Sequence, residues 1–100
     1  MKVTVTPDPA MTMDAARVLI RDLGTFDVSV DTGALPDRMT VTADQRMVHV
    51  TMDLLSDADV TIDDVQEDGH RSFKEAFGDR FPLDGERAAV YMTMCQEGRI

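Results

Sequence analysis

Hydrophobic and polar residues alternate at the start of the chain, and further along the hydrophobic residues recur with helical spacing. Residues 2–6 read Lys-Val-Thr-Val-Thr, which predicts a strand with one buried face. A stripe with helical spacing follows, so we expect a helix that begins at Asp8–Pro9, or at Thr12, a rival cap for a shorter helix. Gly24 is the expected left-handed terminator of this helix. The stripe consists of Met13, Ala16, Leu19, Ile20 and Leu23.

Alternation returns after this helix and predicts further strands. The first covers residues 26–30 and ends before a Gly/Pro turn at 32–37. Residues 39–42 and 47–54 are expected to be two strands joined by a hairpin loop at 43–46. In the second of these strands, one face would carry Val48, Val50, Met52 and Leu54.

The last third of the chain is more ambiguous. Residues 58–62 predict a short acidic strand, unless the chain already turns into a helix there. Ser72 and Glu75 match a capping box, so a helix is expected to begin near Ser72, or upstream near Asp63. Residues 86–97 fit two patterns, and their Val, Tyr and Thr content favours a strand. The competing helical stripe is Ala88, Tyr91, Met92 and Cys95.

These elements predict one α+β domain covering residues 1–100, in the order β-α-β-β-β-(β)-α-β. The simplest packing is a mixed or antiparallel sheet of about five strands with two helices on one face. One hundred residues is a common size for a single domain and is long enough to bury a core.

Charge distinguishes this chain more than any motif does. It has 19 acidic and 10 basic residues, a net charge of −9, and no Lys or Arg lies between Arg46 and Arg71. Such a one-signed stretch repels nucleic acid and anionic membranes and attracts basic protein surfaces. We therefore predict that its acidic side chains bind a partner. They are Asp53, Asp57, Asp59, Asp63, Asp64, Glu67 and Asp68.

The composition also bears on origin and compartment. Asp exceeds Glu and Arg exceeds Lys, a bias that resembles the proteins of salt-loving archaea and their viruses. Cys95 is the only cysteine, so no intrachain disulfide can form. The first residues have no apolar stretch typical of a signal peptide, and no run has transmembrane length. The expected location is the cytoplasm, which would be the host cytoplasm for a viral protein.

A catalytic alternative comes from residues 28–34, Val-Ser-Val-Asp-Thr-Gly-Ala. This segment resembles the active-site loop of the retroviral-type aspartic proteases, which are homodimers. The resemblance implies that Asp31 would be the catalytic carboxylate, sharing one proton with its copy. The family also has a glycine-rich flap hairpin, whereas residues 39–54 contain no glycine. Asp-Thr-Gly is ordinary turn chemistry as well.

No metal or cofactor site is expected. Several residues between Asp57 and Asp68 fall at calcium-loop positions, but Ile62 stands where such a loop needs Gly. On a strand, alternate carboxylates lie roughly 7 Å apart, too far to share one ion closely. His49, His70 and Cys95 do not have the spacing of metal ligands.

These observations predict a non-enzymatic acidic module that binds a basic protein. A virus- or mobile-element-encoded inhibitor of a nucleic-acid-handling protein would suit such a surface, because carboxylates can imitate phosphate charge. One alternative is a structural or assembly subunit of a virion or other oligomer, whose acidity serves solubility in salt. The other is the Asp31 protease. Direct contact with nucleic acid or membrane is not expected, and a homo-oligomer remains open.

Overall fold

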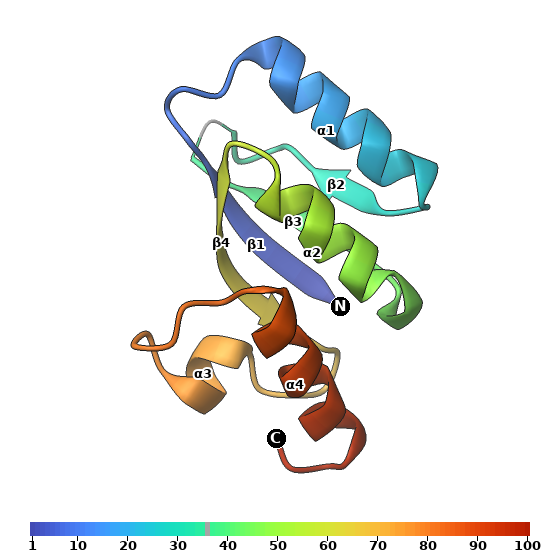
Figure 1. The fold of residues 1–100 in the computed structure, drawn as a ribbon, viewed down its shortest axis with the longest axis vertical. Helices are drawn as coiled ribbons and strands as arrows, with labels where there is room; N and C mark the ends of the chain where they lie inside the picture. Colours follow the sequence, from blue (N-terminus) through green and yellow to red (C-terminus); the bar gives the residue numbers. More distant parts are fainter. Residues whose placement is uncertain (36) are drawn as a thin grey trace.

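The computed structural model describes residues 1–35 and 37–100, in which four strands form an antiparallel sheet. Helices pack along this sheet (Figure 1). The described strands are β1 (Lys2–Pro7), β2 (Ser29–Asp31), β3 (Met39–Thr42) and β4 (Val60–Gln66). The described helices are α1 (Met13–Thr25), α2 (Val48–Ser56), α3 (Phe73–Phe77) and α4 (Gly85–Gln96), with a 3₁₀ turn, η1, at Gln45–Met47. The predicted α+β class is confirmed, but the described chain has four strands and four α-helices instead of about five and two.

The order of the strands in the sheet explains how the chain is wound. The order is β2-β3-β1-β4, and each neighbouring pair is antiparallel. β1 and β2 are therefore parallel with β3 between them, and β3 and β4 are parallel with β1 between them. Two split β-α-β units thus interlock through α1 and α2, which is the ferredoxin-like βαββαβ connectivity. α3 and α4 follow as a C-terminal addition, and α4 packs against α2.

The two faces of the sheet differ in polarity. The covered face carries fully buried side chains such as Val5, Val41 and Val65, and α1 and α2 lie side by side over it (Figure 1). The opposite face is polar and largely exposed. From the strand register, its residues are Lys2, Thr4, Thr6, Ser29, Asp31, Thr40, Thr42, Thr61, Asp64 and Gln66. The alternation predicted for residues 2–6 is confirmed in β1.

The first helix begins and ends later than the Asp8–Pro9 start and the Gly24 terminator predict. Thr12 is the N-cap and its hydroxyl accepts a hydrogen bond from the Ala15 N–H at 3.1 Å, so the rival start is the correct one. Gly24 lies within the helix. The terminator is Asp27, with φ 58°, because the 6→1 and 5→2 hydrogen bonds of a Schellman motif close around it.

The predicted strand at residues 47–54 and the hairpin loop at 43–46 are wrong. Asp44 caps η1 through the Arg46 N–H, and η1 leads directly into α2. The buried residues of α2 follow helical spacing and not the predicted alternation, because this segment covers the sheet instead of joining it. They are Val48, Thr51, Met52 and Leu55.

The strand favoured for residues 86–97 is also wrong. This segment is α4, and its buried residues are the competing helical stripe of Ala88, Tyr91, Met92 and Cys95. Asp84 caps its first turn through the Arg87 N–H at 2.8 Å. Gly98, with φ 73°, ends it in a second Schellman motif.

The remaining elements differ mainly in their bounds. The short acidic strand predicted at 58–62 is confirmed as β4, which is longer. The strand predicted at 26–30 is the shorter β2. The Ser72 cap is confirmed, since its hydroxyl accepts from the Glu75 N–H at 3.2 Å, and α3 starts there and not near Asp63.

Candidate functional site

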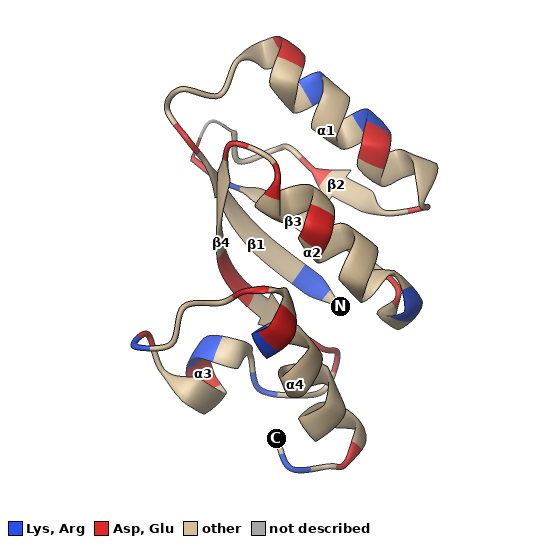
Figure 2. Cartoon of the chain, in the orientation of Figure 1, with Lys and Arg blue, Asp and Glu red and all other residues tan. Residues whose placement is uncertain are grey.

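The acidic segment, defined as the seven predicted partner-binding residues from Asp53 to Asp68, runs from α2 through a turn and along β4 (Figure 2). Its first three members are exposed. Asp53 lies on α2, Asp57 directly follows that helix, and Asp59 lies in the turn before β4. The backbone of this turn is held to the end of β1, because the Asp8 N–H donates to the Asp59 C=O at 2.8 Å. These three carboxylates therefore project from an anchored part of the chain.

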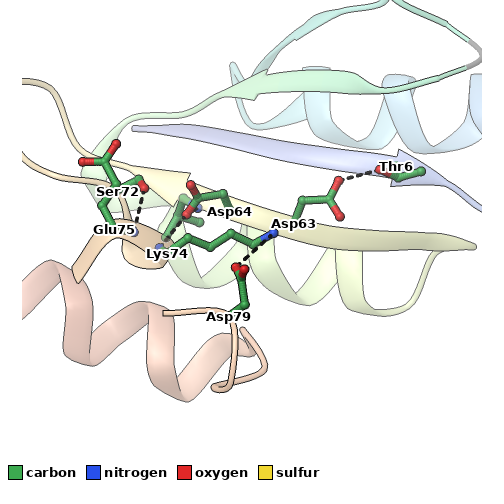
Figure 3. A network of polar contacts seen from close by, with 8 residues as sticks. Thr6, Asp63, Asp64, Ser72, Lys74, Glu75 and Asp79 are labelled. Carbon is green, nitrogen blue, oxygen red and sulfur yellow. Dashed lines mark hydrogen bonds and ion pairs between the residues drawn. The ribbon is translucent and has the colours of Figure 1, made fainter. Parts of the chain in front are cut away.

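The two carboxylates of β4 have local hydrogen-bonding roles. The register of β4 against β1 shifts at this point, which leaves Asp63 as the extra residue of a bulge. Asp63 accepts a hydrogen bond from the Thr6 hydroxyl at 2.5 Å, and Asp64 accepts from the Lys74 N–H at 3.1 Å (Figure 3). Both side chains are half-buried. Asp64 thus satisfies a free amide at the start of α3.

The end of β4 is tied to α4 by one buried hydroxyl. The Tyr91 oxygen accepts from the Glu67 N–H at 2.9 Å and donates to the Arg71 C=O at 2.6 Å. Burial raises the pKa of the Tyr91 hydroxyl, so it keeps the proton that this second bond requires. Glu67 is half-buried, and among the described residues its Oε2 has no hydrogen-bond partner. Asp68, the last member of the acidic segment, is exposed.

Within the described residues, the ion pairs leave out the acidic segment. Among the described residues, no member of the segment lies within 4.0 Å of a Lys or Arg nitrogen as an ion pair. Six of the basic residues pair instead with acidic neighbours close in sequence. These pairs are Arg17–Asp14, Arg21–Asp22, Arg46–Asp44, Lys74–Asp79, Arg87–Asp84 and Arg99–Glu97.

The segment nevertheless does not form one flat surface. Asp53 lies on a helix that covers the sheet, whereas Asp64 belongs to the opposite, polar face of the sheet. The structure therefore separates an exposed group, Asp53, Asp57 and Asp59, from a hydrogen-bonded group on β4. A partner can approach the first group without displacing any internal hydrogen bond.

The residues considered for the two alternative chemistries, an aspartic protease and a metal site, lie in different parts of the fold. Asp31 is exposed at the end of β2, and its Oδ1 accepts from the Gly33 N–H at 2.9 Å, which accounts for Asp-Thr-Gly as a turn. Residue 36 of the predicted 32–37 turn lies outside the described residues. The region compared with the protease flap, residues 39–54, is a strand followed by η1 and most of α2.

The two histidines and the cysteine, considered as metal ligands, also lie in different segments of the chain. His49 is exposed on α2, the Nδ1 of His70 is 2.9 Å from the Ile100 carbonyl oxygen, and Cys95 is buried in α4. Within residues 1–35 and 37–100, no three His, Cys, Asp or Glu side chains are grouped as metal ligands would be. None of the helices in this part of the chain combines the length and apolar character that crossing a bilayer requires.

Sequence reasoning missed a groove between α2 and α4, because it assigned both segments to strands. The groove has a volume of about 700 Å³. Its lining joins Asp53 of the acidic segment to residues of α4 that had no assigned role. The helical stripe at residues 88–95 was a signal that could have identified α4, one of the two helices that form this groove.

Comparison with family models, with curated proteins and with solved structures found no match for this chain. The ferredoxin-like connectivity supports many unrelated functions and transfers none by itself. The function therefore has to be argued from the site.

Proposed function

We propose that this protein is a non-enzymatic binding module that engages a basic protein surface through the acidic segment. The observation that carries the proposal is the exposure of Asp53, Asp57 and Asp59 together with the lack of any ion pair to them among the described residues. Free, hydrated carboxylates held on an anchored turn attract a cationic partner from a distance and orient it on arrival.

The expected strength of this attraction is modest for each contact. An exposed carboxylate–ammonium pair contributes about 0.2–1 kcal/mol, so three such pairs contribute roughly 0.6–3 kcal/mol. Screening shortens the range of these interactions from about 10 Å at 0.1 M salt to about 3 Å at 1 M. Binding that depends on the exposed group must therefore weaken steeply as salt is added.

A protein that normally binds nucleic acid is the partner class that this surface suits best. Such a protein carries Lys and Arg arranged for phosphate, and a row of carboxylates competes for the same side chains. We infer that the module acts as an inhibitor of such a protein, encoded by a virus or mobile element. Its sign of charge and the free carboxylates support this inference.

The proposal can be tested with a labelled, unstructured peptide of alternating Lys, Gly and Ser. The variant under test changes three residues of the acidic segment to Asn: Asp53, Asp57 and Asp59. The matched control makes the same change of charge at exposed positions elsewhere: Asp14, Asp27 and Asp37. We expect the first variant to lose roughly tenfold in affinity at low salt, and the control to lose much less. Equal losses in the two variants, or binding that salt leaves unchanged, would contradict the proposal.

Assembly into an oligomer is the second candidate, and exposed apolar residues favour it. Phe81 and Val90 are 41% and 52% exposed. Copies with a charge of −9 repel one another, so self-association through apolar contacts should increase as salt screens the charge. Sedimentation equilibrium at low and high salt distinguishes the two candidates, because partner binding weakens with salt while assembly strengthens.

A further inference from the structure

The groove between α2 and α4 has acidic walls and an apolar floor. α2 contributes His49 and Asp53 to it, one helical turn apart. Three residues of α4 form its apolar part: Ala89, Val90 and Met94. Its polar rim on α4 and just beyond consists of Glu86, Thr93, Glu97 and Arg99.

Of the three residues of the apolar floor, Val90 is exposed, and Ala89 and Met94 are half-buried. α4 directs one stripe, which includes Tyr91 and Cys95, into the core. Val90 lies on a different face and is 52% exposed in the middle of the helix. A single exposed valine is ordinary, but Val90 also borders a second apolar hollow beside Phe77 and Phe81. Val90 thus links the apolar part of the groove to this second hollow, whereas the other exposed residues of α4 are polar: Glu86, Thr93 and Gln96.

The charge on the walls selects the occupant. Asp53, Glu86 and Glu97 contribute three carboxylates to the lining, and Arg99 is the basic residue that faces them, 3.0 Å from Glu97. Asp57 continues the α2 side one turn further on. A second copy of this acidic chain is disfavoured here, whereas an apolar surface flanked by Lys or Arg is complementary in both polarity and charge.

We propose that this groove binds an amphipathic helix of the basic partner, with apolar residues at i, i+3 or i+4, and i+7 and with Lys or Arg on its flanks. This inference rests on the proposed function and adds the shape of the recognised element to it. α4 has 12 residues and is about 18 Å long, so about three turns of a partner helix can lie along it. The apolar residues of that helix would contact Val90 and Met94, and its cations would contact Asp53 and Glu86.

The test compares two labelled peptides of identical Leu and Lys content, one with helical amphipathic spacing and one scrambled. Val90→Asp is the decisive variant, because it adds a negative charge while it removes the apolar contact. A purely electrostatic surface would bind either peptide more tightly after this change. We expect the amphipathic peptide to bind roughly tenfold more weakly to Val90→Asp, and the scrambled peptide to bind no more weakly than before.

Val18→Asp is the matched control, since Val18 is an exposed valine on α1, 45% exposed and outside the groove. It should leave the preference for the amphipathic peptide unchanged. Val90→Thr keeps both the shape and the charge of the side chain, and it should weaken binding of the amphipathic peptide by a smaller factor. It therefore tests the groove even if Val90→Asp does not fold.

Wild-type protein that binds both peptides equally would overturn the proposed groove while leaving the proposed function intact. Failure of the Lys-Gly-Ser peptide to bind would instead remove the proposed function. A dimer that Val90→Asp dissociates would assign the groove to self-association and overturn the inference.

Discussion

Replacing Tyr91 with Phe removes one hydroxyl group from the core and leaves two backbone groups without their partner. The ring itself is fully buried and its shape is preserved, so the packing against Phe73 should persist. What disappears is the link between the end of β4 and the start of the α3 segment, at Glu67 and Arg71. The variant thus isolates the contribution of this bridge to the stability of the fold.

The magnitude follows from the two hydrogen bonds that are lost. Each contributes about 0.5–1.5 kcal/mol net, and a buried amide or carbonyl left unsatisfied adds to the cost, so we expect a loss of about 2–4 kcal/mol at neutral pH. This is a large share of the roughly 5–15 kcal/mol typical of a domain. Urea unfolding monitored by circular dichroism measures it. Met92→Leu, a buried change on the same helix that conserves volume, is the control and should cost less than about 1.5 kcal/mol.

The effect of Tyr91→Phe should also depend on pH. Burial raises the pKa of the Tyr91 hydroxyl above its ordinary value of 10.0. The unfolded chain therefore releases this proton at a lower pH than the folded chain does. The stability due to the hydroxyl is fully present below pH 10 and is lost as pH rises above 10, with a slope approaching about 1.4 kcal/mol per pH unit.

The difference in unfolding free energy between wild type and Tyr91→Phe should therefore be constant below about pH 9 and shrink above pH 10. Tyr91 is the only tyrosine, so the two proteins have every other titrating group in common. A difference below about 0.5 kcal/mol at neutral pH would refute the proposed bridge. A difference that stays constant up to strongly alkaline pH would refute the argument from burial.

Three further predictions concern helix ends and charge. Ser72→Ala removes the N-cap that accepts the Glu75 N–H and should cost about 1 kcal/mol in urea unfolding, whereas Ser72→Gly should cost only a few tenths. Asp27→Gly should stabilise the protein by up to about 1 kcal/mol, because Asp27 has φ 58° and glycine adopts this conformation without strain; a loss of stability would show that its side chain has another role. Thermal stability should rise when salt increases from roughly 0.05 M to 1 M, because the net charge of −9 is then screened, and a melting temperature independent of salt would contradict this.

The elements predicted correctly are those whose hydrophobic pattern fits the repeat of a strand or of a helix, but not both. Val3 and Val5 alternate with polar residues, and the register shows that they share the covered face with Val65. The Ser72 cap could be recognised because a side-chain cap is a local feature. Whether a strand forms here, and where such a helix begins, depends on a few residues that are neighbours in the sequence. These features can therefore be predicted from the sequence.

Two strands were predicted where helices form, because tertiary packing decided the outcome. In α2, Val48 and Val50 favour a strand by propensity, and the polar Thr51 hides the helical stripe although it is fully buried. In α4 the helical stripe was visible, and Asp84 and Gly98 mark its two ends. Giving these end signals more weight than β propensity would have predicted α4 correctly.

The candidate site was predictable in composition but not in arrangement. The sequence indicates that seven carboxylates occur without intervening cations, but it does not indicate which of them the fold uses internally. Asp63 and Asp64 stand on an edge strand, where charged side chains also discourage pairing with another sheet. Their hydrogen bonds to Thr6 and to the Lys74 amide further tie them to the fold.

Burial thus divides the acidic segment into two groups of carboxylates. The half-buried carboxylates of β4 accept hydrogen bonds at a bulge and at the start of α3, so their removal should mainly lower the stability of the fold. Asp53 lies on α2 and lines the groove that α4 completes, and Asp57 follows directly after this helix; both are exposed. Because Asp53 lines a groove that also contains apolar residues, the proposed binding would combine the long range of charge attraction with the specificity of shape, which a uniformly charged surface cannot provide.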